Sequence, residues 1–325
     1  MAKRFVATSC VLFVLAVSIL SYWLSDSRIP PSVPSRASEL VARKDSAEWY
    51  SAQGAKRTRG VALVVHGLNL RPERMQPIIA ELNDAGMDVL NVSLRGHGGN
   101  FVPNANVTPD EARLESFRGV TYGLWLAEVH ASYLKARERA SRRNVPVFFI
   151  GYSLGGLLGC DLVLSQPDVH YERMALFAPA LNVTVKSYLL KALMPFPDMV
   201  IDSLSPRPYR TNQGTPMAAY KALFEAIDFF HGSMNGKLNK PTIVFIDEED
   251  EFISYSELKE LTSRRNLDRW RIHTVRKDRD IREGVSHHLI IDEESVGEDM
   301  WKRIRSSLRN HLTGRSAPAD RHRED

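Results

Sequence analysis

The sequence predicts an α/β fold in which a mostly parallel, doubly wound sheet carries a helical cap insertion. Short apolar runs alternate with longer helical patterns along most of the chain, as expected when helices cover both faces of a parallel sheet. The alternation is interrupted once, from residue 181 to about residue 240, where apolar pieces occur without a convincing strand. We interpret that stretch as a helical insertion lying over the sheet.

Short apolar runs give the predicted strands. Most do not alternate between apolar and polar residues, which is typical of strands buried on both faces. The last run does alternate, so we expect it nearer an edge of the sheet. In chain order the predicted strands cover residues 61–65, 88–94, 146–150, 173–178, 242–246 and 271–275.

Apolar residues at helical spacing predict the helices between these strands. Residues 73–85 form one such pattern, residues 110–143 form a single long one, and residues 299–312 close the domain. Because the order of strand, crossover and strand recurs along the chain, one doubly wound sheet is the economical architecture.

The N-terminal residues have the pattern of a membrane anchor. Lys3 and Arg4 precede an uncharged, apolar run over residues 5–24, and about twenty apolar residues suffice to cross a bilayer as a helix. Tyr22 and Trp23 stand where aromatic side chains favour the membrane interface. The basic start predicts a cytoplasmic N-terminus and a periplasmic or extracellular domain. A cleaved secretory signal, which would release the protein, remains the alternative.

The rest of the chain divides by composition. Prolines among serines predict an extended linker after the apolar run, and a polar C-terminal segment without apolar periodicity predicts a disordered tail. The predicted parts are the anchor at 1–24, the linker at 25–50, the globular domain at 51–313 with its cap at about 181–240, and the tail at 314–325.

Charge and cysteine content exclude two classes of function. The net charge is +4, but the basic residues are scattered in small groups without interleaved aromatic residues, so we predict no nucleic-acid binding. The chain has only two cysteines, which excludes a disulfide framework and a cysteine-based metal site.

The motif Gly-x-Ser-x-Gly occurs at Gly151, Ser153 and Gly155. A predicted strand precedes it and a helical pattern over residues 157–164 follows it, which is the strand–turn–helix setting of a nucleophilic serine. The sharp turn strains the serine backbone, and glycines two positions away avoid clashes with neighbouring chain. The helix N-terminus favours negative charge that develops beside the serine.

With this motif, the chain resembles the α/β-hydrolase superfamily over roughly residues 60–312, and in particular microbial carboxylesterases and monoacylglycerol lipases with a small helical cap. The resemblance implies an oxyanion hole after the strand that ends in His66-Gly67. Its two donors would be the backbone N–H groups of Leu68 and Leu154. His66 would shape this loop rather than act in catalysis.

The resemblance also implies an acid and a histidine later in the chain. Asp250 fits the family's acid best in the acidic run after the strand at 242–246, and Asp247 would lie too near the strand end. In the pair His287-His288, the family register selects His288, with His287 in the place of a small residue. The order serine, acid, histidine is that of this superfamily.

These residues predict a serine hydrolase that cleaves carboxylic esters through an acyl-enzyme, without a metal or organic cofactor. The predicted partners are a small acyl ester and, through the N-terminal helix, a membrane. Acyl transfer to an alcohol or lipid is an alternative for the same triad, and a non-catalytic binding protein is a more distant one. The insertion is expected either to line an acyl pocket or to pack against the core with Leu189, Leu190, Leu193, Met194 and Phe196.

Overall fold

The computed structural model describes residues 46–53, 58–184, 187, 189–278 and 286–314. The predicted anchor, most of the predicted linker and all but the first residue of the predicted tail lie outside these ranges. Within the described ranges, no helix combines the length and the apolar character that a membrane span requires.

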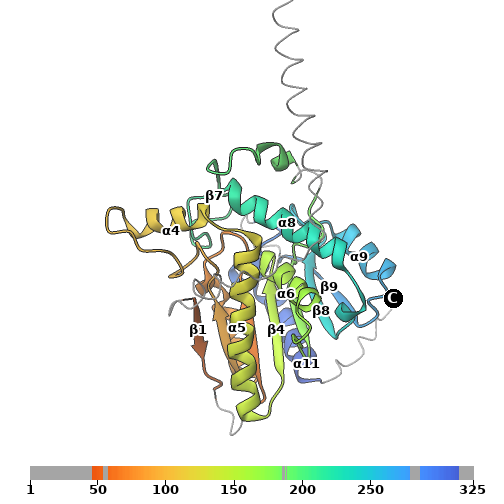
Figure 1. Ribbon diagram of the computed structural model, residues 1–325. Coiled ribbons are helices and arrows are strands. Elements are labelled where there is room, and N and C mark those ends of the chain that lie inside the picture. Colours follow the sequence, from red (N-terminus) through yellow and green to blue (C-terminus); the bar gives the residue numbers. More distant parts are fainter. Residues whose placement is uncertain (1–45, 54–57, 185–186, 188, 279–285, 315–325) are drawn as a thin grey trace, which may run out of the picture.

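A seven-stranded sheet with the order β1-β3-β2-β4-β5-β8-β9 forms the centre of the domain (Figure 1). The pairs from β3 to β9 are parallel, and only β1 runs antiparallel to its neighbour. This arrangement confirms the predicted fold class, and the alternating last strand does lie at an edge. The strands are β1 (Ala47–Tyr50), β2 (Gly60–Val65), β3 (Met87–Val92), β4 (Val147–Tyr152), β5 (Met174–Phe177), β8 (Thr242–Asp247) and β9 (Trp270–Val275).

Helices cover both faces of the sheet. Neighbouring residues of one strand face opposite sides, so a strand that is apolar throughout needs packing partners on both faces. Leu63 of β2 packs in one apolar cluster with side chains of α5, α6, α8 and α9, whereas Val64 packs in another with side chains of α3 and α11. The helices are η1 (Pro72–Met75), α3 (Gln76–Asp84), α4 (Pro109–Arg118), α5 (Tyr122–Arg143), α6 (Leu154–Ser165), α9 (Tyr255–Arg264), α10 (Glu293–Val296) and α11 (Glu298–Thr313).

Two predicted boundaries in the first half of the chain are wrong. The single helix predicted over 110–143 is two helices, since α4 ends at Arg118 with Gly119 as its C-cap, and the Thr121 side chain caps α5 by accepting a hydrogen bond from the Leu124 N–H. The domain begins before residue 51, because β1 lies in the predicted linker and pairs with β3, with Trp49 opposite Leu90. β1 has only four residues, too few to show a strand period.

The insertion at 181–240 contains strands that the sequence did not predict. The short strands β6 (Val200–Asp202) and β7 (Gly214–Pro216) form an antiparallel pair, preceded by η2 (Leu189–Leu193). Helix α8 (Met217–Ser233) then crosses the domain and packs on α6, and η3 (Gly236–Leu238) leads back to the sheet. The outer part of the cap, before α8, stands above the strands at the upper end of the domain in Figure 1.

Candidate active site

Ser153 lies in a strained turn between β4 and α6. Its φ of 51° and ψ of −117° are rare for a residue with a side chain. The flanking glycines allow this turn to pack closely. A Cβ on Gly155 would lie 2.2 Å from the carbonyl oxygen of Val65, and one on Gly151 would lie 2.6 Å from the nitrogen of Gly156. The start of α6 can therefore approach the end of β2, and Ser153 is held at the carboxyl edge of the sheet.

The three predicted triad side chains meet at this edge. The Ser153 Oγ lies 2.9 Å from the His288 Nε2, and the His288 Nδ1 lies 2.8 Å from the Asp250 Oδ2. The second carboxylate oxygen of Asp250 accepts hydrogen bonds from the N–H groups of Phe252 and Ile253, at 2.8 and 2.9 Å. The Asp250 side chain is fully buried and that of His288 is 13% exposed. The result is a continuous hydrogen-bonded chain from a buried carboxylate to a serine hydroxyl.

The neighbouring His287 belongs to a separate pair. Its Nδ1 lies 2.9 Å from the Asp247 Oδ2, and its Nε2 lies 3.5 Å from the Glu249 Oε2. Successive residues of this loop thus carry their rings to different carboxylates, and the geometry joins only His288 to Ser153.

Aromatic rings fix the His288 imidazole. The Tyr152 ring lies 5.2 Å away between centroids, and the Phe252 ring meets the imidazole edge-on at 5.3 Å. The Tyr152 hydroxyl also donates a hydrogen bond to the His288 carbonyl, at 3.2 Å.

Two charged residues that the sequence did not single out hold the histidine loop. The Glu251 carboxylate accepts hydrogen bonds from the Ser286 hydroxyl at 2.7 Å and from the His288 N–H at 3.1 Å. Burial alone would raise the pKa of Glu251, but these bonds and one from the His287 N–H lower it, so the residue stays ionised. Lys277 donates to the carbonyls of Ser286 and Leu289, at 2.7 and 3.1 Å. The acidic run was a signal for Glu251; Lys277 has no local signal.

The predicted oxyanion donors flank Ser153. The N–H of Leu154 is the first of α6, where helices leave N–H groups without intrahelical partners. Within the part of the chain that the structure describes, neither this N–H nor that of Leu68 donates a hydrogen bond. Both groups are therefore available to a ligand.

Two buried histidines shape the loop that carries Leu68. The His66 Nδ1 donates to the Gly67 carbonyl at 2.8 Å, and its Nε2 accepts from the Leu94 N–H at 3.1 Å. The His97 Nε2 accepts from the Asn69 N–H at 3.0 Å. Burial lowers the pKa of His66 to about 4, and burial together with His66 lowers that of His97. Both rings are thus neutral at pH 7, as their role as acceptors requires.

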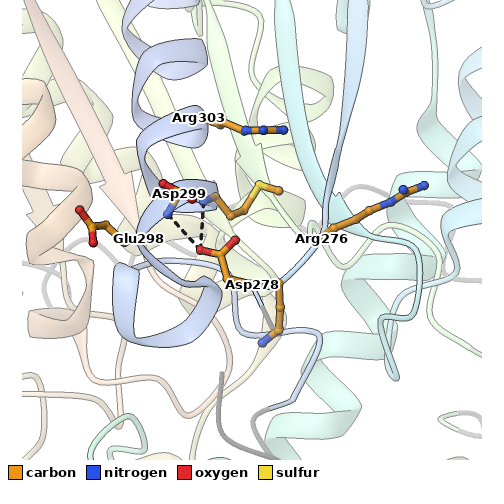
Figure 2. A pocket seen from close by; sticks show the side chains of 7 residues that line it. Arg276, Asp278, Glu298, Asp299 and Arg303 are labelled. Carbon is orange, nitrogen blue, oxygen red and sulfur yellow. Dashed lines mark hydrogen bonds between the residues drawn. The ribbon is translucent and has the colours of Figure 1, made fainter. Parts of the chain in front are cut away.

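A pocket of about 520 Å³ lies apart from these residues. Figure 2 shows the Asp278 carboxylate in it, accepting hydrogen bonds from the first turn of α11, including one from the Asp299 N–H at 2.9 Å. No triad residue lines this pocket, so we do not assign it to the active site. Among the described residues, no group of three or more His, Cys, Asp or Glu side chains could hold a metal ion.

Comparison with known proteins agrees with the fold. A family model described as serine aminopeptidase, S33 (Hydrolase_4) matches residues 56–217, which include Leu68 and Ser153 and end before Asp250. The matched residues and the observed sheet are consistent with an α/β-hydrolase fold. No curated protein matches the chain by sequence.

Similar solved structures include lipases and esterases. A soluble variant of monoglyceride lipase from Saccharomyces cerevisiae, in complex with a substrate analog, superposes with a TM-score of 0.64 and 12% identity, over 84% of this chain and 91% of that one. A metagenome-derived lipolytic enzyme, described together with LipS and LipT, superposes with a TM-score of 0.61 and 19% identity, over 83% of this chain and 98% of that one. A thermostable carboxyl esterase from Bacillus coagulans superposes with a TM-score of 0.58 and 13% identity, over 82% of this chain and 93% of that one. At these identities the likeness supports the shared fold.

Proposed function

We propose that this protein is a serine hydrolase that cleaves carboxylic esters through an acyl-enzyme. The observation that carries the proposal is the hydrogen-bonded chain from Asp250 through His288 to Ser153, which ends on a serine in a strained turn. A serine hydroxyl is a weak nucleophile unless a base accepts its proton, and a base acts best when a third group orients it. Both requirements are met within hydrogen-bond distance.

The proposed reaction has two halves. The His288 Nε2 accepts the Ser153 proton as the Oγ attacks the ester carbonyl, and Asp250 stabilises the imidazolium that forms. The N–H groups of Leu68 and Leu154 hold the oxyanion. The intermediate collapses when His288 protonates the leaving alcohol, which leaves an acyl-enzyme on Ser153. A water molecule then gives a proton to His288 as it attacks the acyl carbon. The second intermediate collapses when His288 returns this proton to the Ser153 Oγ, which breaks the acyl–serine bond and releases the acid.

The cap favours an apolar acyl group. Leu190 and Met194 pack partly buried against the core, on the same apolar cluster as Leu154 of the nucleophile turn. Leu189 and Phe196 are 74% and 58% exposed, so these two predicted pocket residues form the outer surface of the cap. We propose medium-chain or monoacyl esters as the substrate class, in keeping with the lipases and esterases that share the fold.

Hydrolysis of a graded ester series tests the function. We expect the full chain, in detergent, to hydrolyse p-nitrophenyl esters and a monoacylglycerol, and Ser153→Ala to lose about 10⁴-fold or more in kcat, as triad variants do. An unchanged circular dichroism spectrum serves as the control for folding. Activity retained in Ser153→Ala would contradict the proposal. If an added alcohol accepts the acyl group in preference to water, the protein is an acyltransferase with the same triad.

We further propose that residues 1–24 anchor the protein in a membrane with the domain outside the cytoplasm. Ser46, where the described chain begins, accepts a hydrogen bond from the Ser93 N–H just beyond β3, at 2.8 Å. The chain therefore enters the domain at the carboxyl edge of the sheet, where Ser153 lies. Membrane fractionation tests the proposal: the full chain should sediment with membranes, and a chain lacking residues 1–24 should not. Recovery of a shortened, released protein would support a cleaved signal instead.

A further inference from the structure

The loop that carries Leu68 is joined to the cap. Leu70 pairs with Arg210 in an isolated antiparallel bridge, and the Arg71 N–H donates to the Tyr209 carbonyl at 2.8 Å. The cap residues at 209–212 therefore run beside the residues that follow Leu68, although more than a hundred residues separate the two segments in the sequence.

Asn69 forms the centre of this junction. Its side-chain oxygen accepts from the Asn212 N–H at 2.8 Å, and its side-chain nitrogen donates to the Asn212 carbonyl at 3.1 Å. Its own carbonyl accepts from the Thr211 N–H at 2.9 Å, and its N–H donates to His97. Asn69 is 4% exposed and has a φ of 54°, a left-handed conformation that asparagine tolerates better than most residues. Every hydrogen-bonding group of this residue is used.

Asn212 connects the junction to two further segments, those of Gly96 and Arg113. Its side-chain nitrogen donates to the Gly96 carbonyl at 3.0 Å, and its side-chain oxygen accepts from the Arg113 guanidinium at 3.3 Å. Asn212 is 5% exposed, so these bonds form away from water. Removing one partner leaves buried polar groups unpaired, which favours a single arrangement of the two segments.

We propose that Asn69 is a positioning residue for the oxyanion hole, held by Asn212 of the cap. This inference rests on the proposed function. Asn69 directly follows Leu68, so the hydrogen bonds on Asn69 fix the peptide next to the Leu68 N–H. The His66 bond to the Gly67 carbonyl fixes the other side. A donor preorganised in this way acts on the oxyanion, which exists only after attack, and a misplaced donor costs rate more than substrate affinity.

Substitutions at Asn69 separate positioning from backbone strain. Asn69→Gly keeps the left-handed conformation and loses both side-chain bonds to Asn212, whereas Asn69→Asp keeps the acceptor for the Asn212 N–H. Asn144→Gly is the matched control, because Asn144 has a φ of 51° and lies at the opposite edge of the sheet, before β4. The full chain is assayed with its best p-nitrophenyl ester, and kcat is expressed per site labelled by a fluorophosphonate.

We expect Asn69→Gly to lower kcat about 10-fold with little change in KM, less than the 10²–10³-fold that follows removal of an oxyanion donor. Asn69→Asp should fall between this variant and wild type, and Asn144→Gly should match wild type. The Ki of a trifluoromethyl ketone, whose serine adduct places an oxyanion in the hole, should rise in proportion to the fall in kcat/KM.

Three outcomes would overturn the inference. Unchanged kcat per labelled site in Asn69→Gly would show that the junction only stabilises the fold, and a fall in kcat without a rise in Ki would show that it acts elsewhere. Absence of turnover and ketone binding in the wild type would overturn the proposed function and this inference together. The first of these outcomes, normal wild-type turnover with an unaffected Asn69→Gly, would overturn the inference alone.

Discussion

At the scale of single residues, the site distinguishes two adjacent histidines, His287 and His288, that are both candidates for the catalytic base in the sequence. Family register favoured His288 and Asp250 over His287 and Asp247. In the structure His288 bonds to both Asp250 and Ser153, whereas His287 bonds to Asp247. The catalytic roles of His288 and Asp250 stay predictions, which substitution of each of the four residues can test.

Parallel alanine variants of the histidines test the assignment. His288→Ala should lower kcat by about 10⁴-fold, because the base is lost, whereas His287→Ala should stay within about 10-fold of wild type. Asp250→Asn and Asp247→Asn should show the same contrast. Steady-state kinetics on one ester measures all four variants. A greater loss of kcat in His287→Ala than in His288→Ala would show that His287 is the base and would contradict the assignment of His288.

Glycine substitutions test the packing of the nucleophile turn. A Cβ on Gly155 would meet the Val65 carbonyl, so Gly155→Ala should cost about 1–3 kcal/mol in the free energy of unfolding and also reduce turnover. Gly232 in α8 has no atom within 4 Å of an added Cβ, so Gly232→Ala should stabilise by about 0.5 kcal/mol. Urea unfolding measures both. Equal effects of the two substitutions would contradict this description of the turn.

Residue-scale prediction from sequence succeeded where a local motif existed and failed where contacts are long-range. The Gly-x-Ser-x-Gly motif marked Ser153 because the turn needs those glycines at fixed spacing. Lys277 and Asn69 act by hydrogen bonds to backbone groups of distant segments, and such bonds require no particular residue type in a recognisable pattern. The sequence therefore predicted the residues proposed for chemistry, together with His66 of the oxyanion loop, and missed Lys277 and Asn69.

At the scale of elements, apolar runs predicted the buried strands well, because strands covered on both faces need apolar residues throughout. Strand β1 has an exposed Glu48 and only four residues, so it has no such signal. The break between α4 and α5 depends on Gly119 and the Thr121 cap, which the continuing helical pattern concealed. The β6–β7 pair in the cap has three residues in each strand, too few to show a period.

Helix α11 carries a testable pH dependence. Burial, together with the nearby Arg173, lowers the pKa of His311 to about 4, and its Nε2 donates to the Met174 carbonyl at 3.0 Å. The unfolded chain binds a proton below about pH 6.5 that the folded chain does not, so stability is lost as the pH falls from 6.5 towards 4. When the pH falls from 7.5 to 5.5, this histidine should lower the free energy of unfolding by about 1 kcal/mol.

The variant His311→Gln keeps a donor for the Met174 carbonyl and cannot titrate. Its free energy of unfolding should therefore fall about 1 kcal/mol less than that of wild type between pH 7.5 and 5.5. Urea unfolding at the two pH values measures the difference, and the other histidines cancel because they are common to both proteins. Equal losses in the two proteins would contradict the lowered pKa.

At the scale of the whole molecule, the parallel sheet explains why residues from four separate segments meet. Strands β2, β4 and β8 end at one edge, so the loops after them bring Leu68, Ser153 and Asp250 together, and the loop that follows β9 adds His288. The cap joins the same edge through Asn69 and Asn212. The predicted anchor would tether the domain from this edge as well, since the described chain enters there.

Labelling with a fluorophosphonate tests the central claim most directly, because this probe reacts only with an activated serine. We predict that the wild-type chain is labelled, that peptide mapping places the label on Ser153, and that Ser153→Ala and His288→Ala are not labelled at a comparable rate. A folded wild-type chain that does not react, or a Ser153→Ala variant that reacts as fast as wild type, would contradict the account.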